Sequence, residues 1–238
     1  TYQQNHHMLV AQAKAMALLH KMFPEDKIGP APNISLGYPA SCKPEDILAA
    51  QEFNAIRNWL YLDMAVYGRY NNLVWRYLEE HDATPTFREG DEEALKAAHP
   101  DFIGFNYYST STVQHADVNE VLNPGADQQT ARGEAGYYKG FNNPYLTKSE
   151  FGWEIDPLGF RANMREMYSR YHLPMIVTEN GLGAYDTLTE DGKVHDNYRI
   201  AYLRAHIEQL KLAISDGIEM MGYCPWSAID LVSTHEGI

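Results

Sequence analysis

Four apolar strand patterns alternate with helical patterns along the chain, and this alternation limits the possible folds more than any other feature. The clearest strand pattern is the sequence MIVTENG at residues 175–181. Its continuous apolar start is typical of a parallel strand that is covered on both faces, and its glycine marks where the strand ends. We therefore expect Glu179 to lie at the C-terminal end of a buried parallel strand, where α/β enzymes place their chemistry.

The other predicted strands also end at polar or aromatic side chains. They span residues 28–33, 102–108 and 220–226, and they end near Asn33, at Asn106 with Tyr108, and at Trp226. Helical patterns occupy residues 6–22, 45–65, 71–80, 91–98 and 203–217. Asp156 followed by Pro157 predicts the start of a further helix, which runs to about Tyr171.

Residues 109–154 differ from the rest of the chain because they are polar, contain several glycines and show no periodicity. We expect a long loop with little regular structure here. Loops of this length are uncommon in compact domains unless they are functional, so this one is a candidate wall or lid over a site.

Helix-strand repeats with polar residues at the strand ends are typical of a (β/α)₈ barrel, or TIM barrel, which has eight strands and takes about 250 residues. The chain has 238 residues, yet only four strand patterns can be found because long loops account for the rest. We therefore expect an α/β fold that is half of a TIM barrel, with four parallel strands, intervening helices and long loops across residues 1–238. Its open sheet edge would need cover from the missing half, a second copy or another chain. The helical pattern at the N-terminus also suggests a chain that begins partway through a larger protein.

Composition excludes several classes of partner. A formal net charge of −13 argues against nucleic acid and against an anionic membrane surface, since both need a basic face. No stretch approaches the length of a transmembrane helix. Cys42 and Cys224 lie far apart and match no metal spacing, and so few thiols indicate a reducing compartment. We expect a cytoplasmic protein.

Four sequence blocks carry a resemblance to a known family. They are DFIGFNYY at residues 101–108, GWEIDP at 152–157, VTENG at 177–181 and PWSAID at 225–230. Together they resemble family 1 glycoside hydrolases, and the similarity is closest to the 6-phospho-β-glucosidases. The resemblance runs in order along nearly the whole chain and implies that this is the C-terminal half of such an enzyme.

The resemblance also implies roles for individual residues. Glu179 matches the catalytic nucleophile, and Tyr108 matches the tyrosine that orients it and holds its charge. The substrate-binding residues would be Asn106, Trp153 beside the leaving group, Trp226 as a flat wall for the sugar ring, and Ser233 as a ligand of the sugar 6-phosphate. The alternatives are a solvated strand-end acid at position 179 and core packing for the aromatic residues.

One catalytic group of the family has no counterpart in the sequence. Retaining hydrolysis needs two carboxyl groups about 5 to 5.5 Å apart, and the family's general acid belongs to an N-E-P or N-E-I motif that residues 1–30 do not contain. The sequence also stops before the lysine and tyrosine that complete the family's phosphate site.

We expect retaining hydrolysis of 6-phospho-β-glucosides in the full-length parent, without metal or organic cofactor, and impaired activity in the isolated chain. The family resemblance does not distinguish gluco-configured from galacto-configured substrates. The alternatives are a β-glycosidase for unphosphorylated sugars and a non-catalytic half-barrel module.

Overall fold

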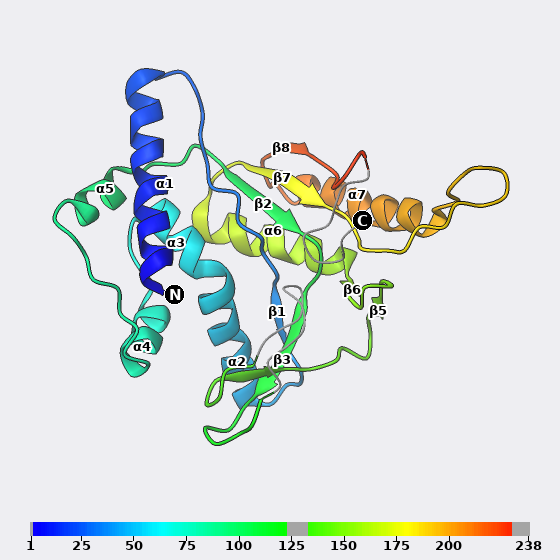
Figure 1. Cartoon of the computed structure of the whole chain (residues 1–238), viewed down its shortest axis with the longest axis horizontal. Helices are drawn as coiled ribbons and strands as arrows, with labels where there is room; N and C mark the ends of the chain where they lie inside the picture. The colour runs from blue at the N-terminus through cyan, green and yellow to red at the C-terminus, as the bar shows by residue number, and fades with distance from the viewer. Residues whose placement is uncertain (1, 123–132, 230–238) are drawn as a thin grey trace.

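The computed structural model describes residues 2–122 and 133–229. Figure 1 shows the order of the elements along the chain. The helices are α1 (Tyr2–Met22), α2 (Pro44–Asn54), the π-helical turn η1 (Ala55–Trp59), α3 (Leu60–Tyr67), α4 (Asn72–Glu80), α5 (Asp91–Ala97), α6 (Pro157–Tyr171) and α7 (Asn197–Ser215). The strands are β1 (Gly37–Pro39), β2 (Ile103–Tyr107), β3 (Ser111–His115), β4 (Tyr138–Gly140), β5 (Thr147–Lys148), β6 (Glu154–Ile155), β7 (Met175–Asn180) and β8 (Met220–Tyr223).

The central sheet has three parallel strands in the order β2-β7-β8. Helices α6 and α7 pack against each other beside this sheet (Figure 1). The core beneath the sheet contains fully buried side chains such as Phe105 of β2, Val177 of β7 and Phe160 of α6. Burial of each such side chain contributes about 1.5–3 kcal/mol, so packing fixes the strand ends relative to one another.

Residues 28–33 were predicted to form the first strand along the chain, but they are not a strand of this sheet. The segment lies along β2, and the carbonyl groups of Pro30 and Pro32 accept hydrogen bonds from the N–H groups of Gly104 and Asn106. A proline has no N–H to return to the neighbouring strand, so only half of a ladder can form. A single bridge joins the last residue of the segment to Asn106. The prediction of four parallel strands is therefore not confirmed, since this sheet has three.

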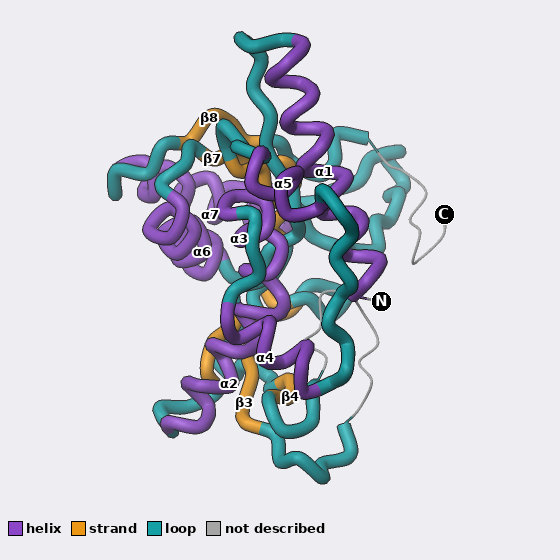
Figure 2. Tube along the Cα trace, turned by 90° about the vertical axis from the view of Figure 1, so that its left-hand side faces the viewer, coloured by secondary structure: helices purple, strands orange, loops and turns teal. Residues whose placement is uncertain are grey.

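The loop predicted at residues 109–154 contains three short strands and the first residue of a fourth, so it has more regular structure than we expected. β3 pairs in parallel with β1 and antiparallel with β4, and β5 pairs with β6. Figure 2 shows β3 and β4 at the opposite end of the molecule from β7 and β8. The partner of β3 is more than seventy residues away at Gly37–Pro39, so no local pattern could indicate the pairing. Val113 of β3 is fully buried against Phe53 and Tyr138.

The predicted helices are present, with shifted ends. The Asp156 side chain caps α6 by accepting a hydrogen bond of 2.7 Å from the N–H of Gly159, and Pro157 occupies the first turn, as expected. The helix predicted at residues 203–217 starts earlier, at Asn197, and ends at Ser215. The predicted strand at residues 220–226 ends at Tyr223, since Pro225 cannot donate to a ladder.

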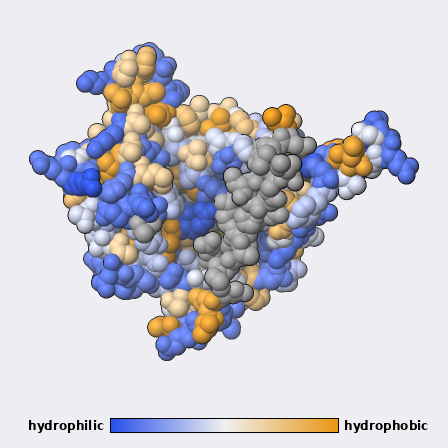
Figure 3. Space-filling view, in the orientation of Figure 1, coloured by the Kyte–Doolittle hydropathy of each residue, from blue (hydrophilic) through white to orange (hydrophobic). Residues whose placement is uncertain are grey.

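Apolar side chains gather on the surface along α1 (Figure 3). Three side chains at or just after the C-terminal end of α1 are each more than half exposed, namely Leu18, Met22 and Phe23. Exposed apolar surface of this kind marks a contact face in many proteins. Along residues 2–122 and 133–229, no helix is long and apolar enough to cross a membrane.

Candidate active site

Glu179 and Tyr108 meet at the C-terminal ends of β7 and β2. The Tyr108 hydroxyl donates a hydrogen bond to Oε2 of Glu179. Burial, together with the bond to Glu179 and its negative charge, raises the pKa of Tyr108 well above its usual value. Tyr108 therefore remains a protonated donor at neutral pH, aimed at one oxygen of a half-buried carboxylate.

An irregularity in strand pairing sets the direction of Glu179. Phe105 pairs with Val177, but the next residue, Asn106, pairs with Glu179, so Thr178 is an extra residue on β7. Extra residues of this kind re-aim side chains next to active sites. The Thr178 hydroxyl donates to Oδ1 of Asn106 at 2.5 Å, which holds Asn106 beside the nucleophile candidate.

Trp153 lies on the other side of Tyr108. It precedes β6, and its ring meets the Tyr108 ring edge to face, with 5.6 Å between centroids. The Phe151 ring also meets the Trp153 ring edge to face, with the same 5.6 Å between centroids. The structure thus brings together Glu179, Tyr108, Asn106 and Trp153.

Trp226 follows β8 and lies beside the end of β7. The backbone N–H of Trp226 donates to the carbonyl of Asn180 at 2.9 Å, and the residue is 47% exposed. The peptide bond between Trp226 and Ser227 is cis. The role of the Trp226 indole as a wall for the sugar ring stays a prediction from the family resemblance. Ser233, the predicted phosphate ligand, lies outside the described residues.

Asn180 links the elements around the site, although it was not among the predicted site residues. It is fully buried, and its side-chain amide donates to the carbonyl of Tyr107 at 2.8 Å and to the Tyr202 hydroxyl at 3.0 Å. Its Oδ1 accepts from the Tyr223 hydroxyl at 2.7 Å. One side chain therefore ties together β2, β7, β8 and α7 directly beside Glu179. The available signal in the sequence was an asparagine directly after a strand-end acid.

The acids that follow Trp153 serve the fold. Asp156 accepts hydrogen bonds from the hydroxyls of Tyr38 and Thr110 at 2.8 and 2.9 Å. Glu154 is buried and accepts from the N–H of Asn143 at 3.2 Å, and burial raises the pKa of its carboxyl. Within the described part of the chain, no other carboxyl group is hydrogen-bonded to Tyr108 or Glu179.

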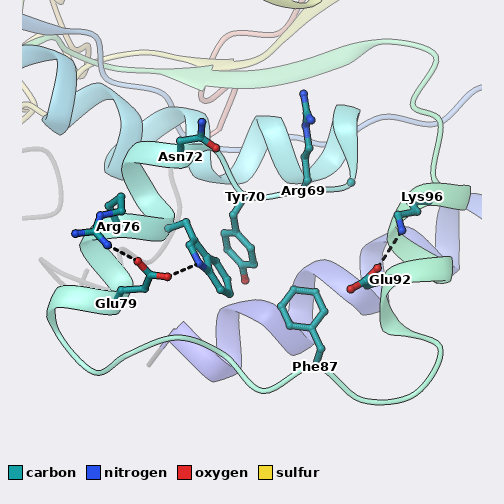
Figure 4. A pocket seen from close by; sticks show the side chains of 10 residues that line it. Arg69, Tyr70, Asn72, Arg76, Glu79, Phe87, Glu92 and Lys96 are labelled. Atoms are coloured by element: carbon teal, nitrogen blue, oxygen red, sulfur yellow. Dashed lines mark hydrogen bonds and ion pairs between the residues drawn. The ribbon is translucent and has the colours of Figure 1, made fainter.

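Two cavities in the described structure lie elsewhere. One of about 430 Å³ lies beside α4 and α5 and is lined by Tyr70, Trp75 and Phe87, with paired charged side chains at its edge (Figure 4). The other, of about 320 Å³, lies between α1 and the extended segment that contains Pro30 and Pro32. Neither is lined by a predicted site residue. No group of three or more metal-ligating side chains is found in residues 2–122 and 133–229.

The carboxylate and its tyrosine lie at the C-terminal ends of parallel strands, which is where barrel enzymes carry their active sites. The family model described as "Glycosyl hydrolase family 1" matches residues 1–238. The chain therefore belongs to glycosyl hydrolase family 1, which confirms the resemblance drawn from the four sequence blocks.

Two relatives with known names are phospho-β-glucosidases. The chain is 43% identical to the aryl-phospho-beta-D-glucosidase BglC of Bacillus subtilis (strain 168) over 99% of this chain and 50% of that protein. It is 42% identical to the 6-phospho-beta-glucosidase AscB of Escherichia coli (strain K12), over 99% of this chain and 47% of the relative. The chain thus spans about half the length of these relatives.

The chain also covers about half the length of similar solved structures. The family 1 b-glucosidase from Thermotoga maritima matches with a TM-score of 0.82 and 32% identity, over 98% of this chain and 48% of that one. A beta-glucosidase from Exiguobacterium marinum matches with a TM-score of 0.83 and 29% identity, over 98% of this chain and 50% of that one. Family 1 glycosidases are TIM barrels, so the chain corresponds to about half of one.

Proposed function

We propose that this chain is the C-terminal half of a retaining 6-phospho-β-glucosidase in which Glu179 is the nucleophile. The observation that carries the proposal is the hydrogen bond from Tyr108 to Glu179 at the ends of adjacent parallel strands. A nucleophilic carboxylate needs one oxygen held and the other free to attack, and Oε2 is the oxygen that Tyr108 holds.

In the proposed reaction, the free oxygen of Glu179 attacks the anomeric carbon of the sugar. The glycosidic bond breaks, its electron pair leaves on the aglycone oxygen, and a general acid protonates that oxygen. Water, activated by the same residue acting as a base, then attacks the anomeric carbon and releases Glu179. The Tyr108 hydroxyl stabilises the carboxylate before attack and orients it toward the sugar.

The general acid would come from the half that this chain does not contain. The relatives are about twice as long as the chain, which leaves room for a second half of barrel size. That half is the proposed partner, and self-association is the alternative cover for the exposed side chains along α1. Below, "the complete enzyme" means this chain together with the N-terminal half.

The proposed substrate is a 6-phosphorylated β-glucoside. The relatives named above are phospho-β-glucosidases. Ser233 is the proposed phosphate ligand on this chain, and a cation from elsewhere must accompany it, because the net charge of −13 repels a dianion. The free, exposed thiols Cys42 and Cys224 suit a reducing compartment, so we place the enzyme in the cytoplasm.

A second candidate function is hydrolysis of unphosphorylated glucosides. The observation in its favour is 35% identity to the 1,4-beta-D-glucan glucohydrolase of Thermotoga neapolitana, over 98% of this chain and 51% of that protein. A non-catalytic half-barrel module is the third candidate, and the absence of an N-E-P or N-E-I acid from residues 1–30 favours it for the chain in isolation.

The test compares p-nitrophenyl β-glucoside with its 6-phosphate as substrates of the complete enzyme. We expect kcat/KM to be much higher for the phosphorylated substrate, and equal values would exclude phosphate recognition. Glu179→Gln should lower kcat by at least about 10³, since loss of a covalent catalyst costs several kcal/mol of barrier. Glu208→Gln is the matched control because Glu208 is exposed on α7. Activity of the Glu179 variant above about a tenth of the wild-type rate would contradict its assignment as nucleophile.

A further inference from the structure

The hydroxyl of Tyr202 lies between the two strand ends that carry the site. Tyr202 belongs to α7 and is only 3% exposed. Its oxygen accepts a hydrogen bond from Nδ2 of Asn180 at 3.0 Å and donates one to the carbonyl of Tyr108 at 3.3 Å. One hydroxyl thus bonds to the residue that follows Glu179 and to the backbone of the tyrosine that holds Glu179.

The two bonds are directional and leave little freedom. Nδ2 of Asn180 has two hydrogens, and the carbonyl of Tyr107 takes one while Tyr202 takes the other. The Tyr202 hydroxyl accepts from that amide, so its single proton is free for the carbonyl of Tyr108. The donor and acceptor pattern therefore has one consistent arrangement, which locks the ends of β2 and β7 together.

His206 fixes the ring of Tyr202 from one turn further along α7. The two rings stack with 3.9 Å between centroids at an interplanar angle of 27°. Nδ1 of His206 lies 2.8 Å from the carbonyl of Tyr202, and it must carry a proton because a carbonyl only accepts. The phenol is therefore held both by its own hydroxyl bonds and by a neighbouring ring that cannot rotate freely.

We propose that Tyr202 is a positioning residue for catalysis, which sets the Tyr108–Glu179 contact by joining Asn180 to the backbone of Tyr108. This role rests on the proposed function of Glu179. Tyr202 itself touches neither reacting carboxylate oxygen, so it acts through its two neighbours. Loss of its hydroxyl leaves the buried amide of Asn180 without one acceptor and releases the carbonyl of Tyr108.

The test is Tyr202→Phe in the complete enzyme, because phenylalanine keeps the ring and its stacking on His206. We expect kcat to fall by about tenfold while KM changes less than about twofold, as for an interaction that matters in the transition state. Tyr198→Phe is the matched control: it removes a hydroxyl from the same helix, where Tyr198 bonds to Asp186 near the surface. The control should keep the wild-type kcat.

A double variant separates positioning from general loosening of the fold. If Tyr202 acts through Tyr108, the double variant Tyr202→Phe/Tyr108→Phe should have nearly the same kcat as Tyr108→Phe alone, because coupled residues are not additive. The proposal would be overturned if the kcat losses of the two single variants multiplied in the double variant. It would also be overturned if Tyr202→Phe kept the wild-type kcat, with or without a lower melting temperature. An inactive Glu179→Gln combined with a fully active Tyr202→Phe would reject this inference alone, whereas an active Glu179→Gln would reject the proposed function.

Discussion

Gly181 packs closely against the carbonyl oxygen of Trp226. A Cβ atom at position 181 would lie 2.0 Å from that oxygen, far inside any allowed contact. The glycine of the VTENG block therefore lets the backbone after β8 approach the end of β7. From the sequence alone, Gly181 was expected only to mark the end of a strand.

Gly181→Ala should push the Trp226 segment away from the site. We expect KM of the complete enzyme to rise about tenfold, which corresponds to about 1.4 kcal/mol of lost binding. Steady-state kinetics and the tryptophan emission spectrum measure the two effects. Gly222→Ala on β8 is the control, since a Cβ there would meet only the side chain of Ile176 at an ordinary 3.4 Å. A Gly181 variant with unchanged KM and emission would show that the close contact does not position Trp226.

Tyr108→Phe should lower kcat of the complete enzyme by about 10², because a preorganised donor to a reacting oxygen is worth that much in other enzymes. KM should change little, since the hydroxyl bonds to Glu179. Tyr145→Phe removes a hydroxyl from a side chain that is 92% exposed and is the matched control. Equal kcat values for the two variants would show that the bond to Glu179 has no catalytic role.

His206 should make stability depend on pH. Burial lowers the pKa of His206 to about 4. The unfolded chain takes up a proton near pH 6.5, whereas the folded protein does so only near pH 4, so the folded state loses stability as the pH falls through this window. The contribution is fully present above pH 6.5. At pH 5 the free energy of unfolding should be about 2 kcal/mol lower than at pH 7.5 from this residue alone.

Urea unfolding of the complete enzyme at the two pH values measures this difference. His206→Phe keeps a flat ring against Tyr202 and should remove the dependence. His195→Asn is the control, because His195 is 58% exposed and pairs with Asp191 at the surface. The same slope in the wild type and in His206→Phe would assign the pH dependence to other groups.

The isolated chain should hydrolyse cellobiose 6'-phosphate at least about 10² to 10⁴ times more slowly than the complete enzyme, since it lacks general acid assistance. It should also self-associate through the exposed apolar side chains along α1. Addition of the N-terminal half should restore part of the activity and produce a complex of the size expected for one copy of each half. Assays and size-exclusion chromatography with and without that half test both points. Full activity from a monodisperse preparation of the chain alone would mean that the acid lies on this chain.

Local sequence patterns predicted those parts of the fold that local chemistry decides. The apolar run before Glu179 gave β7, and Asp156 with Pro157 gave the start of α6. The strand expected at residues 28–33 failed because two prolines remove the donors that a ladder needs. The pairing of β3 with β1 joins distant segments and leaves no periodic signal.

The site residues also divide into those that the sequence predicted and those that depend on distant parts of the chain. Glu179, Tyr108, Asn106 and Trp153 were identified from the family resemblance, and the structure places them together. Asn180 and Tyr202 were missed because their importance lies in partners contributed by other strands and helices. A buried amide becomes informative only when the groups that satisfy it are known.

Covalent capture of Glu179 tests the central claim most directly. A 2-deoxy-2-fluoro-β-glucosyl fluoride 6-phosphate has a leaving group that departs without general acid help, and the fluorine at carbon 2 slows hydrolysis of the intermediate. We expect the complete enzyme to gain the mass of one 2-deoxy-2-fluoroglucosyl 6-phosphate group, with fragmentation placing it on Glu179, and Glu179→Gln to gain none. A label on any other residue, or fluoride release at the wild-type rate from Glu179→Gln, would contradict Glu179 as the nucleophile.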